Sequence, residues 1–139
     1  MDLWEGGLRA PAIVRWPEVP AGKPTDQATI SMDWSATMLA AGGASADPSY
    51  PLDGDDLTSV CSSARRPYDR SFFWRTILRD AARTGSWKYL KDAGIEYLFD
   101  VVVDPGEKND LKAAQPEVFA RLKTQFAEWS GQMLPKPAR

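Results

Sequence analysis

An apolar stripe near the C-terminus restricts the fold more than any other part of the sequence. Large apolar side chains follow one another there at spacings of three or four residues, which is the pattern of one face of an α-helix. A proline stands in the first turn of this segment, so we predict a helix over residues 116–131. The stripe has to be covered by other apolar side chains. Its members are Phe119, Leu122, Phe126, Trp129 and Met133.

The partner that the sequence offers to this stripe is an aromatic region before it. Residues 71–78 have the composition of a strand, and residues 79–85 are interpreted as a turn. Residues 87–91 and 95–100 are two further strand segments, joined by Asp92-Ala93-Gly94 as a three-residue hairpin loop. The predicted fold class is therefore α+β, with a small antiparallel sheet of about four strands packed by the C-terminal helix.

The N-terminal part predicts a strand and a helix. Residues 12–16 are apolar and β-branched between two prolines, which is typical of a short buried strand at the limit of a sheet. Since no partner strands are evident nearby, we interpret it as the last strand of a sheet whose other strands are not in this chain. A helix of about ten residues follows over 32–41, with Ser31 as its N-cap and Gly42-Gly43 as its end.

The composition excludes several functions. The 139 residues include no histidine, which removes the usual general acid or base at neutral pH and the commonest ligand of transition metals. A net charge of −2 provides no basic surface for nucleic acid or anionic lipid. No apolar run is long enough for a membrane span, and no signal peptide is evident. A periplasmic or secreted location of a longer parent protein stays open.

A series of short motifs resembles, in order, the C-terminal part of the sulfatases, members of the alkaline-phosphatase-like superfamily. The resemblance implies that residues 1–45 are the terminal strand and helix of the large α/β sulfatase domain. Residues 46–70 would be a connecting loop, and residues 71–139 the small α+β subdomain. The motifs are Trp4-Glu5-Gly6-Gly7-Leu8-Arg9-Ala10-Pro11, Ser31–Thr37, Pro51–Gly54, Gly85–Leu90, Glu96–Asp100 and Asp104–Leu111.

The same resemblance implies hydrolysis of aryl or carbohydrate sulfate esters. An intact family member would use a formylglycine made from a cysteine or serine, and a bound calcium ion. The nucleophile motif, the calcium ligands and the histidines are expected upstream, so no catalytic residue, metal ligand or cofactor is assigned within this chain. We predict that the chain is inactive in isolation, which leaves open whether it is an enzyme by itself.

The opening motif follows the position of an active-site lysine in the family. Glu5, Gly6, Gly7 and Arg9 would then form a shoulder beside that active site. A structural ion pair between Glu5 and Arg9 inside a tight turn is the favoured role for these two charges. Lys88 matches a recurrent family lysine, and we expect it at the surface of the C-terminal subdomain or in its contact with the main domain.

Some residues imitate functional sites. Cys61 and Arg65 have the spacing of the nucleophile motif, but Ser63 stands where that motif has proline, so an incidental loop cysteine is favoured. For Asp53, Asp55 and Asp56 a solvated turn is favoured over a calcium loop, because the required series of oxygen ligands is missing. Residues 104–107 are likewise interpreted as a turn and not as a binding site. Core packing is favoured over a carbohydrate platform for the aromatic group Phe72, Trp74, Trp87 and Tyr89.

A second function belongs to a different class. The chain could be a non-catalytic module that self-associates, or pairs with a separate N-terminal sulfatase chain, through an exposed strand over residues 12–16. The missing N-terminal sulfatase domain or a second copy is therefore the expected partner. The sequence does not name the sulfated substrate.

Overall fold

The computed structural model describes residues 2–136, and its internal contacts divide this stretch into two units. One unit combines residues 2–11 with residues 70–136, and the other comprises residues 12–69. None of the helices among the described residues is long and apolar enough to cross a membrane.

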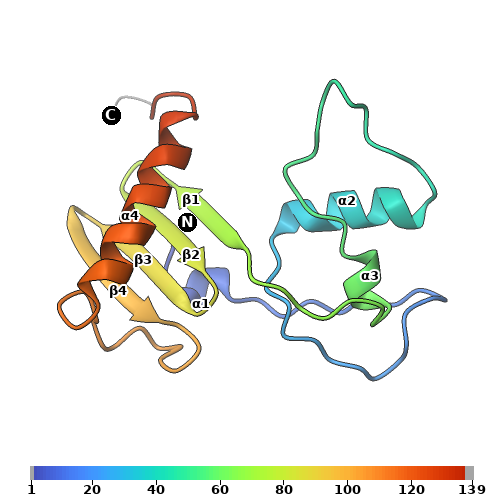
Figure 1. Cartoon of the computed structure of the whole chain (residues 1–139), viewed down its shortest axis with the longest axis horizontal. Helices are drawn as coiled ribbons and strands as arrows, with labels where there is room; N and C mark the ends of the chain where they lie inside the picture. The colour runs from blue at the N-terminus through green and yellow to red at the C-terminus, as the bar shows by residue number, and fades with distance from the viewer. Residues whose placement is uncertain (1, 137–139) are drawn as a thin grey trace. The chain divides into compact units, whose positions relative to one another are not determined.

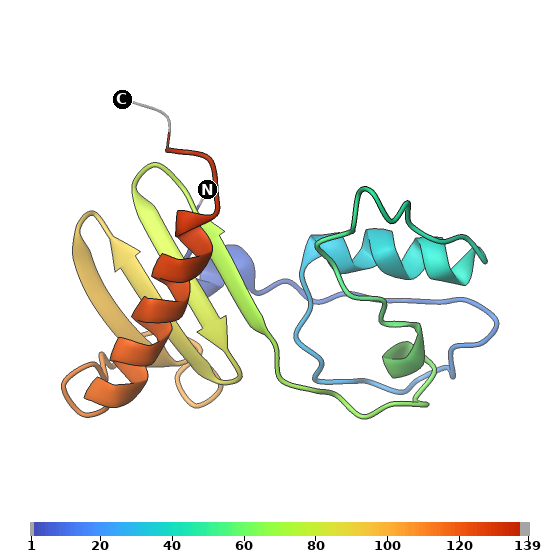
Figure 2. The same ribbon diagram turned by 45° about the horizontal axis from the view of Figure 1, so that its top comes forward.

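The first unit is built on an antiparallel sheet of four consecutive strands. These are β1 (Ser71–Arg75), β2 (Arg79–Thr84), β3 (Trp87–Asp92) and β4 (Ile95–Asp100), hydrogen-bonded in that order. Helix α4 (Pro116–Gly131) lies across one face of the sheet, as Figures 1 and 2 show. The predicted α+β class, the four-stranded sheet and the covering C-terminal helix are confirmed.

The face of the sheet under α4 contains the predicted stripe. Leu122 and Phe126 are buried against Ala82 and Tyr89. The rings of Phe73 and Trp129 stack with centroids 5.3 Å apart. The buried part of the stripe ends there, because Met133 lies beyond the helix and is 40% exposed.

The opposite face of the sheet is covered by the start of the chain. Leu3 is fully buried in a cluster with Ala81, Leu90, Phe99 and Val101. It is followed by the single helical turn α1 (Glu5–Leu8), which lies behind the strands in Figure 1. The sheet is therefore covered on both faces by segments from opposite ends of the chain.

Three local predictions in this unit were wrong. The predicted turn over residues 79–85 is mostly strand β2, because its alanines, Ala81 and Ala82, are each buried on one face of a sheet covered on both sides. The turn instead covers residues 76–78, so the strand predicted over residues 71–78 already ends at Arg75. The hairpin between β3 and β4 has a two-residue loop, Ala93 and Gly94, and not the predicted three-residue loop; both residues have positive φ (49° and 90°). Such loops match the right-handed twist of the strands.

The second unit, residues 12–69, contains two helices, α2 (Ser31–Ala41) and α3 (Thr58–Cys61). The predicted helix over 32–41 is confirmed, but its N-cap is Ile30 and not Ser31. The amide of Ile30 donates to Asp33 Oδ2 at 2.8 Å, which is the hydrogen bond that the third helical residue contributes to a capping box.

The predicted strand over residues 12–16 is absent. These residues have no regular secondary structure, and Ile13 is 98% exposed. The flanking Pro11 and Pro17 have no amide hydrogen, and the four strands of the described residues pair only with one another. A strand with no partner cannot satisfy its backbone groups within a sheet.

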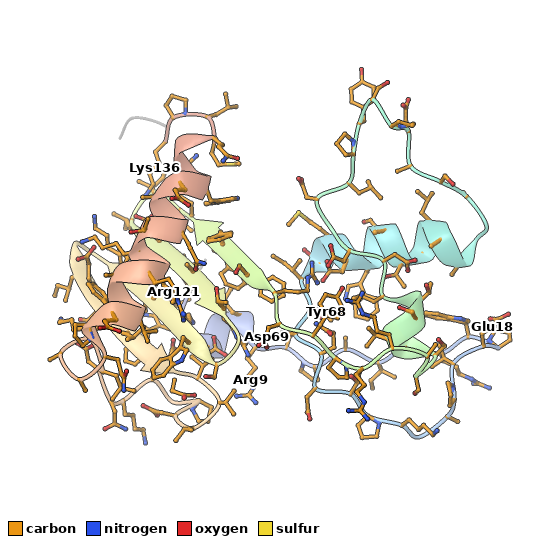
Figure 3. All side chains as sticks on the ribbon, viewed as in Figure 1. Arg9, Glu18, Tyr68, Asp69, Arg121 and Lys136 are labelled. Atoms are coloured by element: carbon orange, nitrogen blue, oxygen red, sulfur yellow. The ribbon has the colours of Figure 1, made fainter. Side chains whose placement is uncertain are left out.

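The two family-like motifs of this second unit meet at α2. Asp33 Oδ1 accepts the amide of Asp55 at 2.9 Å, and Asp55 Oδ2 accepts the hydroxyl of Tyr68 at 2.9 Å (Tyr68 is labelled in Figure 3). A Cβ on Gly54 would lie 2.2 Å from the carbonyl oxygen of Met32, so this backbone approach requires glycine. Asp55 therefore belongs to a structural turn against α2.

Candidate functional site

A buried trio of charged side chains lies between the opening segment and the sheet. Lys88 Nζ is 2.9 Å from Glu5 Oε1 and 2.8 Å from Glu107 Oε1. The side chain of Lys88 is fully buried, and those of both glutamates are 3% exposed. We call Glu5, Lys88 and Glu107 the ionic trio. Each member comes from a different family-like motif.

Lys88 is buried because of its register in the sheet. It lies on β3 opposite Arg83 of β2 and Phe99 of β4, on the face that the opening segment covers. Arg83 contributes a more distant positive charge, with Nη1 3.8 Å from Glu5 Oε2. A lysine with no access to water needs such carboxylate partners to remain charged.

Glu107 reaches the trio from a loop after β4 that is closed by its own hydrogen bonds. The carboxylate of Asp104 accepts the amides of Lys108 and Asn109, each at 2.8 Å. These hydrogen bonds, that of Asn109 above all, lower the pKa of Asp104. Glu107 itself has a φ of 52°, and its Oε2 accepts the amide of Glu5 at 2.5 Å. One carboxylate therefore contacts both the lysine and the first amide of α1.

Other contacts fasten the opening segment at its two ends. The indole nitrogen of Trp4 donates to Asp92 Oδ2 at 2.9 Å, and its ring lies 5.6 Å from that of Tyr97. Beyond α1, Arg9 Nη1 donates to the carbonyl oxygen of Val101 at 3.4 Å; Figure 3 labels Arg9. The opening segment is thus held at Trp4, at Glu5 and at Arg9.

The Trp4–Asp92 contact predicts a pH dependence of stability. Hydrogen bonds from Trp4 and Arg79 lower the pKa of Asp92 below its ordinary value of 3.8. The folded state therefore favours the ionised carboxylate, and this stabilisation is present above the ordinary pKa and is lost as pH falls through the folded-state pKa. We expect Asp92→Asn to be less stable than wild type at pH 7, with the difference shrinking below about pH 4. Urea titrations of both proteins across this range measure it, and a difference that grew on acidification would contradict the assignment.

The predicted shoulder residues have unequal surroundings. A Cβ on Gly7 would lie 2.6 Å from the backbone oxygen of Asp2, whereas a Cβ on Gly6 would meet nothing within 4 Å. We expect Gly7→Ala to lower the free energy of unfolding by about 1–3 kcal/mol, because backbone atoms have to move. Gly6→Ala is the matched control and should be neutral or stabilising by up to about 1 kcal/mol. Equal effects of the two substitutions in chemical denaturation would contradict this difference.

One sequence-based expectation about the charges was wrong, and a second was met in one of its two alternatives. Glu5 contacts Lys88 and Arg83 and not Arg9, because a helical turn directs the two side chains of the opening motif to different partners. Of the two places expected for Lys88, the surface is wrong because the side chain is buried, whereas a contact with the segment assigned to the main domain is found in its ion pair with Glu5. Lys88 and Leu90 are two residues apart in the predicted strand and therefore lie on the same face of β3. This spacing was the signal available in the sequence. Glu107 was assigned to a turn and its place in the ionic trio was missed.

The imitations of functional sites have structural explanations. The pKa of Cys61 is raised by partial burial and by nearby Asp56, which disfavours the reactive thiolate. Within residues 2–136, no group of three or more histidine, cysteine, aspartate or glutamate side chains is placed to hold a metal ion. The four aromatics divide between the two faces of the sheet and are packed there, so they form no common platform: Trp87 and Tyr89 face α4, and Phe72 and Trp74 face away from it.

Comparison with known proteins gives these contacts a family context. No family model matches the chain. Human steryl-sulfatase is 28% identical over 96% of this chain and 30% of its own length. Pig N-acetylgalactosamine-6-sulfatase is 34% identical over 61% of this chain and 16% of its own. The crystal structure of Ps i-CgsB aligns with 83% of this chain and 27% of that protein, with a TM-score of 0.73 and 25% identity.

The α+β unit and its motifs therefore define a sulfatase-type C-terminal portion. The chain is a homologue of the sulfatase family over that portion, and it spans less than a third of the human relative's length. The predicted recognition is confirmed at this level. Three of the motifs that carried it supply one charge each to the ionic trio.

Proposed function

We propose that this chain acts as the C-terminal part of a sulfuric ester hydrolase for aryl or carbohydrate sulfate esters. The observation that carries the proposal is the ionic trio, in which Glu5, Lys88 and Glu107 join three family-like motifs into one buried contact. The name of the pig relative, N-acetylgalactosamine-6-sulfatase, supports the carbohydrate alternative. Aryl esters follow from the family resemblance.

Within this proposal, Glu5, Gly6, Gly7 and Arg9 form a shoulder beside an active site that residues outside this chain complete. The chain's own residues hold that shoulder in place, and we assign them no step of bond cleavage. Calcium and formylglycine belong to the intact family member. The described residues do not fit either group, because they assemble no metal-binding cluster and Cys61 has a raised pKa.

The proposal has a test in two arms. The isolated chain, incubated with a chromogenic aryl sulfate and calcium, should release no more product than a Cys61→Ala control. A chimera of human steryl-sulfatase, with this chain in place of the matched portion, should be more active than the same sulfatase lacking that portion. Circular dichroism confirms that the chimera is folded. Turnover by the isolated chain that depends on Cys61, or a folded chimera no more active than the truncation, would contradict the proposal.

We further propose that residues 12–69 contact the N-terminal part of a sulfatase. Large apolar side chains are exposed there, among them Ile13 (98%), Met38 (67%) and Tyr50 (77%). Apolar surface of this kind favours association. Self-association through the same exposed side chains is the alternative, since residues 12–16 form no strand. Light scattering over a concentration series separates the two, because only self-association gives a dimer of the chain alone.

A further inference from the structure

Two members of the ionic trio belong to elements whose main-chain hydrogen bonds do not involve the third. Lys88 is in β3, which is paired along its length with β2 on one side and β4 on the other. Glu107 is in the loop that Asp104 closes through three hydrogen bonds to Lys108 and Asn109. A positive charge and a negative charge therefore occupy defined positions on the sheet side.

Glu5 has no such support from its own element. Helix α1 has four residues, and a helix of this length is unstable on its own because nucleation is unfavourable. Its main-chain hydrogen bonds run from Gly7 and Leu8 to the oxygen of Trp4, and from Arg9 to that of Glu5. The amide of Glu5 donates to Glu107 Oε2 at 2.5 Å, and its carboxylate accepts a hydrogen bond from Lys88 Nζ at 2.9 Å. The helical turn is thus attached to the sheet through Glu5 at two points.

Buried charges are an expensive way to obtain stability, because apolar side chains of similar volume often stabilise a fold equally well. Their advantage is geometric, since a charged hydrogen bond has a defined length and direction and apolar contacts do not. Leu3 and Trp4 already provide apolar cover next to the trio. The charges are therefore better explained by a role in orienting the opening segment than by a role in holding it on the sheet.

We propose that Lys88 and Glu107 are positioning residues, which act through Glu5 to orient the helical turn Glu5–Leu8 on the sheet. In this orientation Gly6 and Arg9 are exposed, while the guanidinium group of Arg9 donates to the carbonyl oxygen of Val101. The importance of these two exposed residues for a sulfatase rests on the proposed function above. The orienting contact itself does not.

The test compares the wild-type chain with a neutral triple variant, Glu5→Gln/Lys88→Met/Glu107→Gln. This variant removes all three charges together and leaves none of them unpaired. Hydrogen exchange is followed at the amides of Gly7, Leu8 and Arg9 and, as the internal reference, at those of β2 and β3. The hydrogen-bonded indole of Trp4 provides a separate NMR signal. The matched control is Lys91→Met, on the same strand but on the opposite face.

We expect exchange at the α1 amides of the triple variant to be faster by at least about tenfold, with the β2 and β3 amides unchanged and the Trp4 indole signal shifted. Lys91→Met should leave all of these signals as in the wild type. The proposal would be overturned if the α1 amides of the triple variant exchanged as slowly as those of the wild type. It would also be overturned if exchange were accelerated equally in α1 and in the sheet, because the trio would then only stabilise the fold as a whole. Since sulfate hydrolysis is not measured here, an inactive chimera with a positive exchange result would overturn only the proposed function.

Discussion

Replacing Lys88 by methionine alone is expected to lower the free energy of unfolding by about 3–5 kcal/mol. The substitution preserves most of the side-chain volume but removes the cation between Glu5 and Glu107. Two carboxylates with 3% exposed side chains would then remain with only Arg83 nearby, 3.8 Å from Glu5. Leaving a buried charge without its partner costs far more than removing an exposed pair. Urea unfolding followed by circular dichroism measures the loss.

The control for this experiment is Lys91→Met on the same strand. Lys91 lies on the α4 side of β3 and is half-buried, so its charge is hydrated. We expect its loss to change stability by no more than about 0.5 kcal/mol. A similar effect of both substitutions would show that the strand tolerates methionine poorly for reasons unrelated to the ionic trio. A negligible effect of Lys88→Met would show that the two glutamates do not depend on the lysine.

Truncating Leu122 to alanine is expected to lower the free energy of unfolding by about 2–5 kcal/mol. Leu122 is completely buried at the centre of the stripe, in one cluster with Ala82, Tyr89 and Phe126. The surrounding aromatic rings and the sheet backbone cannot collapse fully into the space that the missing methyl groups leave. The loss therefore combines the transfer free energy of the removed atoms with the cost of a cavity.

Leu134→Ala is the matched control for this truncation. Leu134 follows α4 and is 85% exposed, so removing the same atoms should change stability by less than about 0.5 kcal/mol. Thermal unfolding of the two variants beside wild type separates the effect of burial from that of composition. Equal midpoints for Leu122→Ala and wild type would mean that α4 does not pack on the sheet as described.

Local patterns predicted the regular elements well where one face of each is buried. The helix over residues 116–131 agrees with α4 at both ends, because its stripe has a helical period and a proline marks its first turn. The helix around residues 32–41 was also found. Strand β2 was missed because Arg79–Thr84 has two buried alanines and little apolar bulk, so its composition does not differ from that of a turn.

The strand predicted over residues 12–16 shows the opposite error. Its composition is that of a buried strand, yet a strand requires neighbours with which to exchange hydrogen bonds. The strands among the described residues pair only with one another, and Ile13 is exposed. The composition of a segment indicates its preference for the strand conformation, but a strand forms only where neighbouring strands are available to pair with it.

The sequence by itself determined the class of the fold, the C-terminal helix and the relation to the sulfatases, because each rests on a local period or a short ordered motif. Only the tertiary structure decided what the charges of those motifs do. Glu5 is 83 residues from Lys88 and 102 from Glu107 along the chain, so no local pattern could pair them. Their contact depends on the register of β3, the loop after β4 and the burial of both sheet faces, and these are settled only when the whole unit packs.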